Sequence, residues 1–188
     1  MQLRRRIAFL LVAIGVTVAG SVVTAHHAWA NGPGTVVNLN SGKCLQPFPD
    51  SFPGHIVDIY TNGIPIQQVD CNGSPEQQWR TQFLFNARPH DIPTPMYIII
   101  NNLTGQCLDV ADANPNNGAR IQQWECNGGW SEGWYPYLSY NGVYSKIENL
   151  RTDKCLDVPG QTLERVNMQQ WGCFDGIDNV AQMFTGLL

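Results

Sequence analysis

The chain has 188 residues, with 11 basic and 15 acidic side chains and a formal net charge of −4. An excess of acid disfavours binding to the phosphates of nucleic acid or to anionic membranes. With 18 glycines and 12 prolines, long helices are not expected either.

The first thirty residues are typical of a secretory signal peptide. A basic start at residues 4–6 precedes an apolar run at 7–23 and the small-x-small cleavage pattern Ala28-Trp29-Ala30. A membrane anchor is the alternative, but a run of about 17 residues is at the short limit for crossing a bilayer. We therefore expect a secreted, extracellular protein without membrane insertion. It would consist of residues 31–188 in a single domain, and loss of the three arginines would make it more acidic.

Three segments of the predicted mature chain repeat the same elements in the same order. Each has a turn and a cysteine, then two glutamines before a second cysteine, and finally an aromatic residue. The first cysteines are Cys44, Cys107 and Cys155, and the second are Cys71, Cys126 and Cys173; the closing aromatics are Trp79, Trp134 and Phe184. This repetition predicts three copies of one unit, at about residues 35–88, 96–140 and 144–187.

The local pattern in each copy predicts β-structure. The runs 36–39, 97–100 and 146–150 are rich in β-branched residues, are bounded by turn-forming residues and precede the first cysteine of a copy. No stretch keeps a helical apolar period over three turns. Short strands joined by many turns predict an all-β barrel or sandwich. We expect the closing aromatics to fill its centre, because each can bury roughly 150–250 Å².

The six cysteines are all in the predicted mature chain, and an even number behind an export signal predicts disulfides. Spacing alone leaves 15 possible pairings. The repeats predict one bridge per copy: Cys44–Cys71, Cys107–Cys126 and Cys155–Cys173. A zinc site is the alternative, but the sequence has no C-x-x-C motif and no Cys/His cluster, so we expect neither a metal nor a cofactor.

Three groups of motifs resemble those of the ricin B-type lectin family. They are Cys-Leu-Asp-Val at 107–110 and 155–158, the Gln-Gln-Trp-x-Cys segments at 122–126 and 169–173, and the Gln-x-Trp-like closures. The resemblance covers about residues 35–187. It implies a β-trefoil, in which repeats called α, β and γ surround a pseudo-threefold axis and each can hold one shallow sugar site.

The resemblance also implies which residues bind the sugar. The acid after the first cysteine accepts hydrogen bonds from sugar hydroxyls, the aromatic before the second cysteine stacks on the pyranose, and polar residues complete the rim. A carboxylate binds hydroxyls through strong charge-assisted bonds, and an indole covers the C–H face of the ring. The matching residues are Asp109, Gln122, Trp124 and Glu132 in the β repeat, and Asp157, Gln169, Trp171 and Gln182 in the γ repeat.

The three copies depart from the family pattern to different degrees. The family's closing Asn-Gln pair is Ser131-Glu132 in the β repeat, and Ala181 replaces the asparagine in the γ repeat, where Asn179 lies in a short insertion. The α repeat has Gln46 and Val69 at the acid and aromatic positions, so we expect it not to bind sugar. The alternative is a purely structural role, in which the two acids bond only their own turn amides and the tryptophans are ordinary sheet residues.

The expected function is that of a non-catalytic, monomeric module that binds glycans or polysaccharides; relatives bind galactose, xylose, arabinose or mannose. The alternative is a protein-interaction β-trefoil, such as an inhibitor or a toxin-associated subunit, because the α site is degenerate and residues 46–65 form an apolar insertion. Catalysis is not expected. No motif surrounds a pair of acids, and no Gly-x-Ser-x-Gly is present.

Overall fold

The structure, a computed structural model, describes residues 34–48, 58–87, 93–176 and 178–187. The predicted signal peptide therefore lies outside the described residues, as do residues 49–57 of the apolar insertion at 46–65. The strands are β1 (Gly34–Thr35), β2 (Val37–Asn38), β3 (Cys44–Pro47), β4 (Ile64–Val69), β5 (Gln78–Ala87), β6 (Thr94–Asn101), β7 (Cys107–Val110), β8 (Ile121–Trp124), β9 (Trp134–Tyr140), β10 (Tyr144–Asn149), β11 (Lys154–Asp157), β12 (Val166–Asn167), β13 (Gln169–Gly172) and β14 (Phe184–Thr185). Short 3₁₀ helices include η1 (Pro75–Gln77), η3 (Ala111–Ala113), η4 (Trp130–Glu132), η5 (Pro159–Gln161) and η6 (Val180–Gln182).

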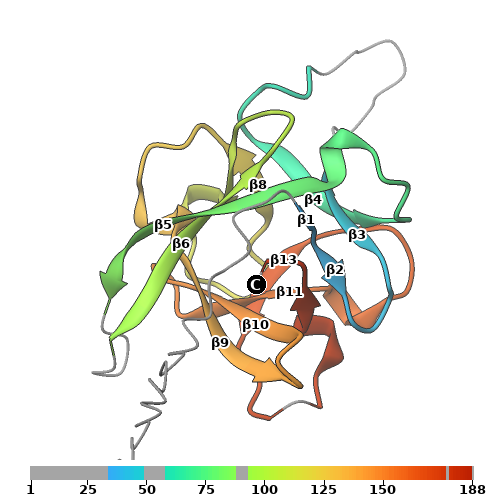
Figure 1. Cartoon of the computed structure of the whole chain (residues 1–188), viewed down its shortest axis with the longest axis vertical. Coiled ribbons are helices and arrows are strands. Elements are labelled where there is room, and N and C mark those ends of the chain that lie inside the picture. Colours follow the sequence, from blue (N-terminus) through green and yellow to red (C-terminus); the bar gives the residue numbers. More distant parts are fainter. Residues whose placement is uncertain (1–33, 49–57, 88–92, 177, 188) are drawn as a thin grey trace, which may run out of the picture.

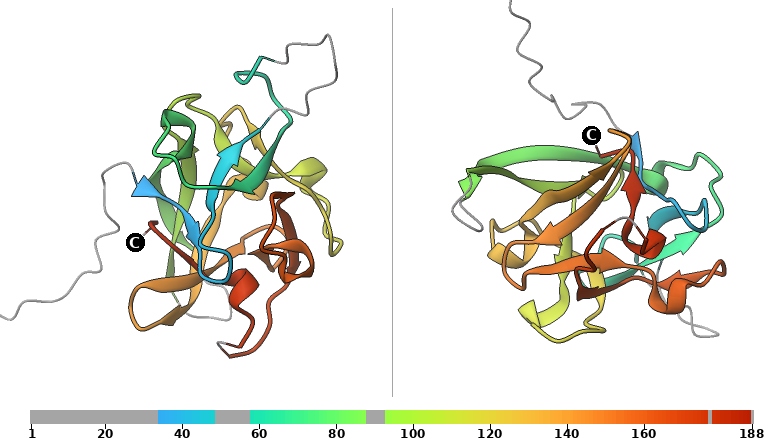
Figure 2. Two further views of the ribbon diagram at one scale, coloured as in Figure 1. Left: turned by 90° about the vertical axis from the view of Figure 1, so that its right-hand side faces the viewer. Right: turned by 90° about the horizontal axis from the view of Figure 1, so that it is seen from below.

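The strands form one antiparallel sheet that closes on itself. Its hydrogen-bonded path runs β1-β5-β6-β7-β8-β4-β3-β2-β14-β10-β11-β13. Because β9 pairs with both β6 and β10, the path is joined into a barrel (Figures 1 and 2). The fold is a β-trefoil, and the expected all-β class is confirmed. Among the described residues, no helix is long and apolar enough to cross a membrane.

The closing aromatics of the three copies lie in the centre of the barrel, as predicted. Trp79 and Trp134 are each 1% exposed, and Phe184 is 2% exposed. Both indoles donate a hydrogen bond at 2.9 Å to a backbone carbonyl, that of Leu45 or Leu108, just after the first cysteine of the same copy. Each tryptophan therefore connects the end of its repeat to the beginning of that repeat.

A buried asparagine near the start of each repeat bonds the end of the repeat that precedes it around the barrel. Asn38, Asn101 and Asn149 stand six residues before the first cysteines and are fully buried. Each side-chain oxygen accepts a turn amide, and each Nδ2 donates to a carbonyl near a closing aromatic, at 2.7–3.0 Å. The same contact is thus made once in each repeat, as expected of a fold with pseudo-threefold symmetry.

The three predicted disulfides are present, one in each repeat. Their Cα atoms are 5.0–5.1 Å apart, which is the usual spacing for such a bridge. In the described part of the chain, a cluster of potential metal ligands groups Glu148 with Cys155 and Cys173. Those two sulfurs are bonded to each other, so they cannot act as thiolate ligands.

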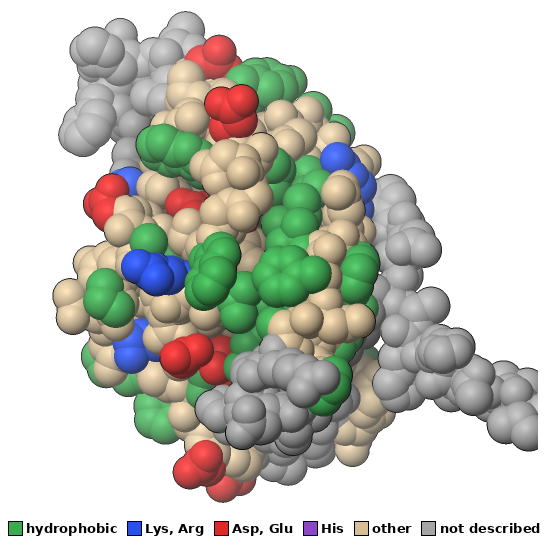
Figure 3. All heavy atoms as spheres, turned by 90° about the vertical axis from the view of Figure 1, so that its left-hand side faces the viewer, with side chains coloured by type: hydrophobic (Ala, Val, Ile, Leu, Met, Phe, Trp, Pro, Cys, Tyr) green, Lys and Arg blue, Asp and Glu red, His purple; other side chains and the backbone are tan. Residues whose placement is uncertain are grey.

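One face of the molecule carries exposed aromatic residues. Phe83 and Phe85 on β5 are 52% and 43% exposed, and the Phe83 ring packs edge-on against Tyr97 of β6 at 6.0 Å. Figure 3 shows hydrophobic side chains gathered in the middle of the face that forms the left-hand side of Figure 1, where β5, β6 and β9 lie.

Candidate functional site

Strand pairing brings the predicted site residues of the β and γ repeats together. In the β repeat, Asp109 on β7 stands opposite Gln122 on β8. Because side chains alternate along a strand, Gln122 and Trp124 share one face, while Gln123 between them points to the other. The γ repeat repeats this arrangement on β11 and β13, where Asp157 stands opposite Gln169.

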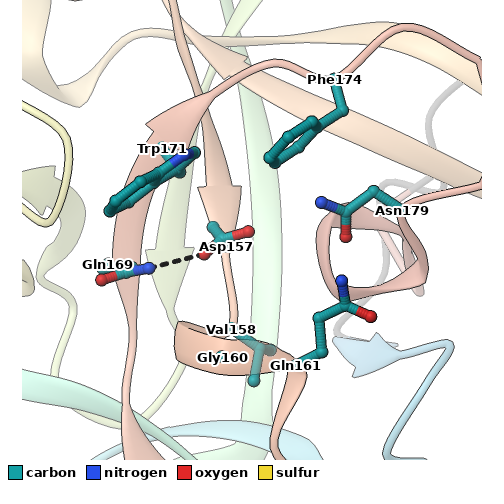
Figure 4. A pocket seen from close by; sticks show the side chains of 8 residues that line it. All are labelled: Asp157, Val158, Gly160, Gln161, Gln169, Trp171, Phe174 and Asn179. Atoms are coloured by element: carbon teal, nitrogen blue, oxygen red, sulfur yellow. Dashed lines mark hydrogen bonds between the residues drawn. The ribbon is translucent and has the colours of Figure 1, made fainter.

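The γ residues line a cleft of about 380 Å³. Asp157 lies at its floor, where Gln169 donates a hydrogen bond of 2.7 Å to the carboxylate (Figure 4). Trp171 is 38% exposed and forms one wall. Phe174 and Asn179 lie on the side that faces Trp171 (Figure 4).

The β residues line a smaller cleft of about 270 Å³. Its floor is Asp109, which accepts a hydrogen bond of 2.9 Å from Gln122. Trp124, 37% exposed, lines this cleft as Trp171 lines the γ cleft. Asn127 and Ser131 line it as well, and the turn of η3 contributes Asp112 and Ala113. As the sequence predicted, an acid and an indole therefore line the same cleft in two of the three repeats.

Both floor acids are held by neighbours and still have free acceptor capacity. Burial raises the pKa of the Asp109 carboxyl above its ordinary value, while hydrogen bonds from Ser131 and Gln122 oppose that rise. Burial likewise raises the pKa of Asp157, against hydrogen bonds from Gln169 and Gln182. An ionised carboxylate has about four acceptor positions, so each acid can still bind hydroxyls presented to it in the cleft. Asp109 also accepts the backbone amide of Val110, so it bonds its own turn as well as its side-chain partners.

The predicted rim residues Glu132 and Gln182 lie behind the clefts rather than on their walls. They are 1% and 0% exposed. The carboxylate of Glu132 accepts the backbone amides of residues 127 and 128, and Gln182 accepts the amide of Phe174 while donating to the carbonyl of Gly172. The structure thus shows these two side chains holding the cleft loops in place. Direct contact between them and a sugar stays a prediction.

In the α repeat, the corresponding side chains are bonded to other protein groups. Gln46, in place of the acid, accepts a hydrogen bond from Gln77 at 3.1 Å. Gln67, in place of the first glutamine, donates to Asn167 and accepts from Arg165. The guanidinium of Arg165 also lies 3.5 Å from the centre of the Phe48 ring. Among its described residues, this copy therefore has neither the acid nor the indole of the two clefts.

Sequence reasoning missed Phe174, Ser131 and Asn127 as cleft residues. Asn127 and Phe174 both directly follow the second cysteine of their copies, so aligning the repeats at that cysteine would have indicated them. Ser131 was noted only as a departure from the family pattern, although its hydroxyl bonds Asp109. The buried asparagines before the first cysteines were missed as well, despite their constant spacing.

Comparison with known proteins shows which family and which solved structures this chain resembles. Residues 81–171 match the model described as a ricin-type beta-trefoil lectin domain-like family. A designed threefold-symmetric protein, ThreeFoil, is similar over 83% of this chain and 98% of its own, with 24% identity and a TM-score of 0.67. An exo-beta-1,3-galactanase from Clostridium thermocellum is similar over 84% of this chain, with 28% identity and a TM-score of 0.65. The match spans 30% of the galactanase chain, a little under a third of its length.

A further solved structure with this fold is a lectin. The ricin B-like lectin of Macrolepiota procera, described in complex with lactose, is similar over 83% of this chain and 94% of its own, with 16% identity and a TM-score of 0.59. At that identity the likeness concerns the fold alone. The family match over residues 81–171 and the shared fold confirm the predicted resemblance to ricin-type β-trefoil lectin domains.

Proposed function

We propose that this chain is a secreted, non-catalytic module that binds glycans or polysaccharides through its β and γ clefts. One observation carries the proposal: in each cleft, a buried acid and a half-exposed indole face the same space. A sugar offers hydroxyls at its edge and C–H groups on its face, which these two side chains complement. The lactose complex of the Macrolepiota procera lectin, which shares the fold, supports the class of ligand.

Two shallow clefts on one molecule favour surfaces that carry many sugars. A single cleft of this size buries little area, and we expect free monosaccharides to bind weakly. Linking two sites can raise retention on a multivalent surface by about 10²–10⁴ over one site. Polysaccharide or a glycan-bearing surface is therefore the expected natural target.

Retention on sugar-bearing columns tests the proposal. The mature chain is passed over matrices carrying galactose, xylose, arabinose or mannose, together with D109A, D157A and the double variant. We expect the parent to be retained on at least one matrix, each single variant to elute earlier, and the double variant to elute unretarded. Glu164→Ala is the matched control, because it removes an exposed acid from outside both clefts. Parent-like retention of the double variant would refute the site assignment.

The non-catalytic part of the proposal is tested separately. Incubation of the purified chain with soluble polysaccharides, followed by analysis of released oligosaccharides, is expected to give no product. Release that persists in the D109A/D157A variant would reveal an activity located elsewhere. The protein-interaction alternative depends on the apolar insertion at residues 46–65, part of which lies outside the described residues. That alternative stays a prediction.

A further inference from the structure

The residue after the second cysteine differs between the repeats. It is Asn72 in the α repeat, Asn127 in the β repeat and Phe174 in the γ repeat. In all three, its backbone N–H donates to the closing Gln or Glu side chain, at 2.9–3.2 Å. The backbone of the three copies is thus equivalent at this point, and the change concerns the side chain.

In the α and β repeats this asparagine is used to close a tight turn. The side-chain oxygen of Asn72 accepts the amide of Ser74 at 2.9 Å, and that of Asn127 accepts the amide of Gly129 at 2.7 Å. Phenylalanine cannot make such a bond. The γ loop therefore needs another group to fix it.

Lys146 on β10 supplies that group. It is fully buried, and its ammonium donates to the carbonyl oxygens of Phe174 and Gly176, the latter at 2.6 Å. The corresponding position in the β repeat, three residues before the buried asparagine, holds Ile98. Among the described repeats, this cation is thus a feature of the γ copy, and it binds the backbone of the very loop in which asparagine has been replaced.

The exchange turns an aromatic ring toward the cleft. Phe174 is 44% exposed and lines the γ cleft on the side facing Trp171 (Figure 4). Asn179 lies beside it; its side-chain oxygen is bonded to the amide of Ala181, which leaves its NH₂ group to face a ligand. The described residues that line the β cleft include Asn127 and Ser131, and Trp124 is the one aromatic residue among them.

We infer that Phe174 is a second sugar-contacting wall, so that the γ cleft binds a sugar more strongly and more selectively than the β cleft does, and that Lys146 is the positioning residue of Phe174. The inference rests on the proposed function. A pyranose has C–H groups on both faces, and two rings on opposite sides of a cleft can cover both of them. Such a cleft suits a terminal sugar unit that enters by one edge, with its hydroxyls on Asp157, while substituents on either face would clash. The β cleft, with one ring, also accommodates units within a chain.

The two clefts can be read separately in solution, because each has its own indole N–H. Signals of Trp124 and Trp171 in a ¹H–¹⁵N spectrum are assigned with Trp→Phe variants, and the mature chain is titrated with galactose, xylose, arabinose and mannose. In the parent, we expect the sugar that binds to move the Trp171 signal at lower concentration than the Trp124 signal. D157A should abolish only the Trp171 response.

Two variants test the second wall. F174A, and F174N with the residue of the β copy, should raise the Kd read at Trp171 by about tenfold while leaving the titration at Trp124 unchanged. In both variants, the Kd values of the four sugars read at Trp171 should also differ less from one another than in the parent. If Trp171 responds in both variants with the parent's Kd, the inference is overturned although the proposed function stands. If neither indole responds to any sugar in the parent, both fail.

Lys146 is tested by Lys146→Met and Lys146→Arg. Methionine keeps the length but donates no hydrogen bond, so binding at Trp171 should weaken; arginine can donate to two carbonyls and should restore part of it. The Trp124 titration must stay parent-like, which a general loss of structure would not allow. If the methionine variant folds and binds sugar at Trp171 like the parent, the positioning role is refuted. If it does not fold, the arginine variant carries the test. Weaker sugar binding at Trp171 than in the parent, with an unchanged Trp124 titration, then supports the role, and binding equal to the parent's refutes it.

Discussion

The residue two positions before the closing aromatic is Glu132 in the β repeat, whereas the α and γ repeats have Gln77 and Gln182 there. Gln77 and Gln182 each donate from the amide to a backbone carbonyl near the second cysteine, as well as accepting loop amides. An ionised Glu132 can accept but cannot donate. Burial raises its pKa, the loop amides of residues 127 and 128 oppose this, and the nearby Asp109 raises it further.

We predict that Glu132→Gln stabilises the protein at neutral pH. A carboxyl whose pKa is raised in the folded state opposes folding when it is ionised, so the parent's stability falls as pH rises through that pKa. The variant gains the missing donor, worth about 1 kcal/mol, and loses the repulsion from Asp109. Urea unfolding should show the gain at pH 7 and little of it near pH 4, where a protonated Glu132 can donate. An equal gain at both values would contradict the explanation.

The raised pKa of both floor acids also predicts how binding depends on pH. Only the ionised carboxylate is a pure acceptor, so retention on the sugar matrix should fall as pH decreases through the raised values. Asp109 and Asp157 should therefore stop binding at a higher pH than ordinary aspartates would. Column retention of the D109A and D157A variants, followed from pH 7 downwards, measures the remaining cleft each time. Unchanged retention down to the ordinary range of aspartate would contradict this.

At the scale of elements, the buried asparagines hold neighbouring repeats together. Asn101 at the end of β6 accepts the amides of residues 103 and 104 and donates to the carbonyl of Glu76 at 2.7 Å. Its removal leaves buried backbone groups without partners, each at a cost of about 1–3 kcal/mol. None of these residues lines the β or the γ cleft, so we expect the substitution to affect stability rather than sugar binding.

We predict that Asn101→Ala lowers the free energy of unfolding by about 2 kcal/mol or more. Asn102→Ala is the matched control, because Asn102 is exposed and its side chain accepts a hydrogen bond of 3.2 Å from the Arg80 guanidinium, and the loss of such a surface bond should change stability little. Chemical unfolding of the three proteins gives both numbers. Equal stability of the two variants would show that the link between repeats is not important.

At the scale of the whole molecule, the disulfides close loops within repeats, whereas the sheet joins repeats to one another. The bridges span 27, 19 and 18 residues. In the chain-entropy model each stabilises by about 3 kcal/mol, with little dependence on loop length. We predict that replacing either the Cys44–Cys71 or the Cys155–Cys173 pair by alanine costs a similar amount, measured by urea unfolding. A loss confined to one of the two pairs would contradict the model.

Export stays a prediction of the sequence. The signal-like segment ends at Ala30, so mass spectrometry of the protein collected from the medium should give a chain that begins at Asn31. A chain that is found in the membrane fraction and retains residues 1–30 would favour the membrane-anchor alternative.

Much of the fold could be predicted from the sequence because the same pattern of residues recurs in three copies. A cysteine, a glutamine pair and an aromatic recur in order, which predicted the pairing of the disulfides, an all-β barrel or sandwich, and the central position of Trp79, Trp134 and Phe184; the β-trefoil itself was implied by the family resemblance. The alternation of side chains along a strand likewise placed Gln122 with Trp124 on one face. These properties depend on local spacing, and local spacing can be read from one chain.

The tertiary structure alone decided which polar residues face the clefts and which support them from behind. Glu132 and Gln182 share a motif with the cleft residues, yet the closing turn directs them inward to loop amides. Lys146 is 28 residues from Phe174 along the chain, so the contact that places this ring opposite Trp171 has no signal in the sequence. A repeat pattern describes what its copies have in common; the direction of a side chain at a turn, and the distant group that fixes it, depend on how the whole barrel closes.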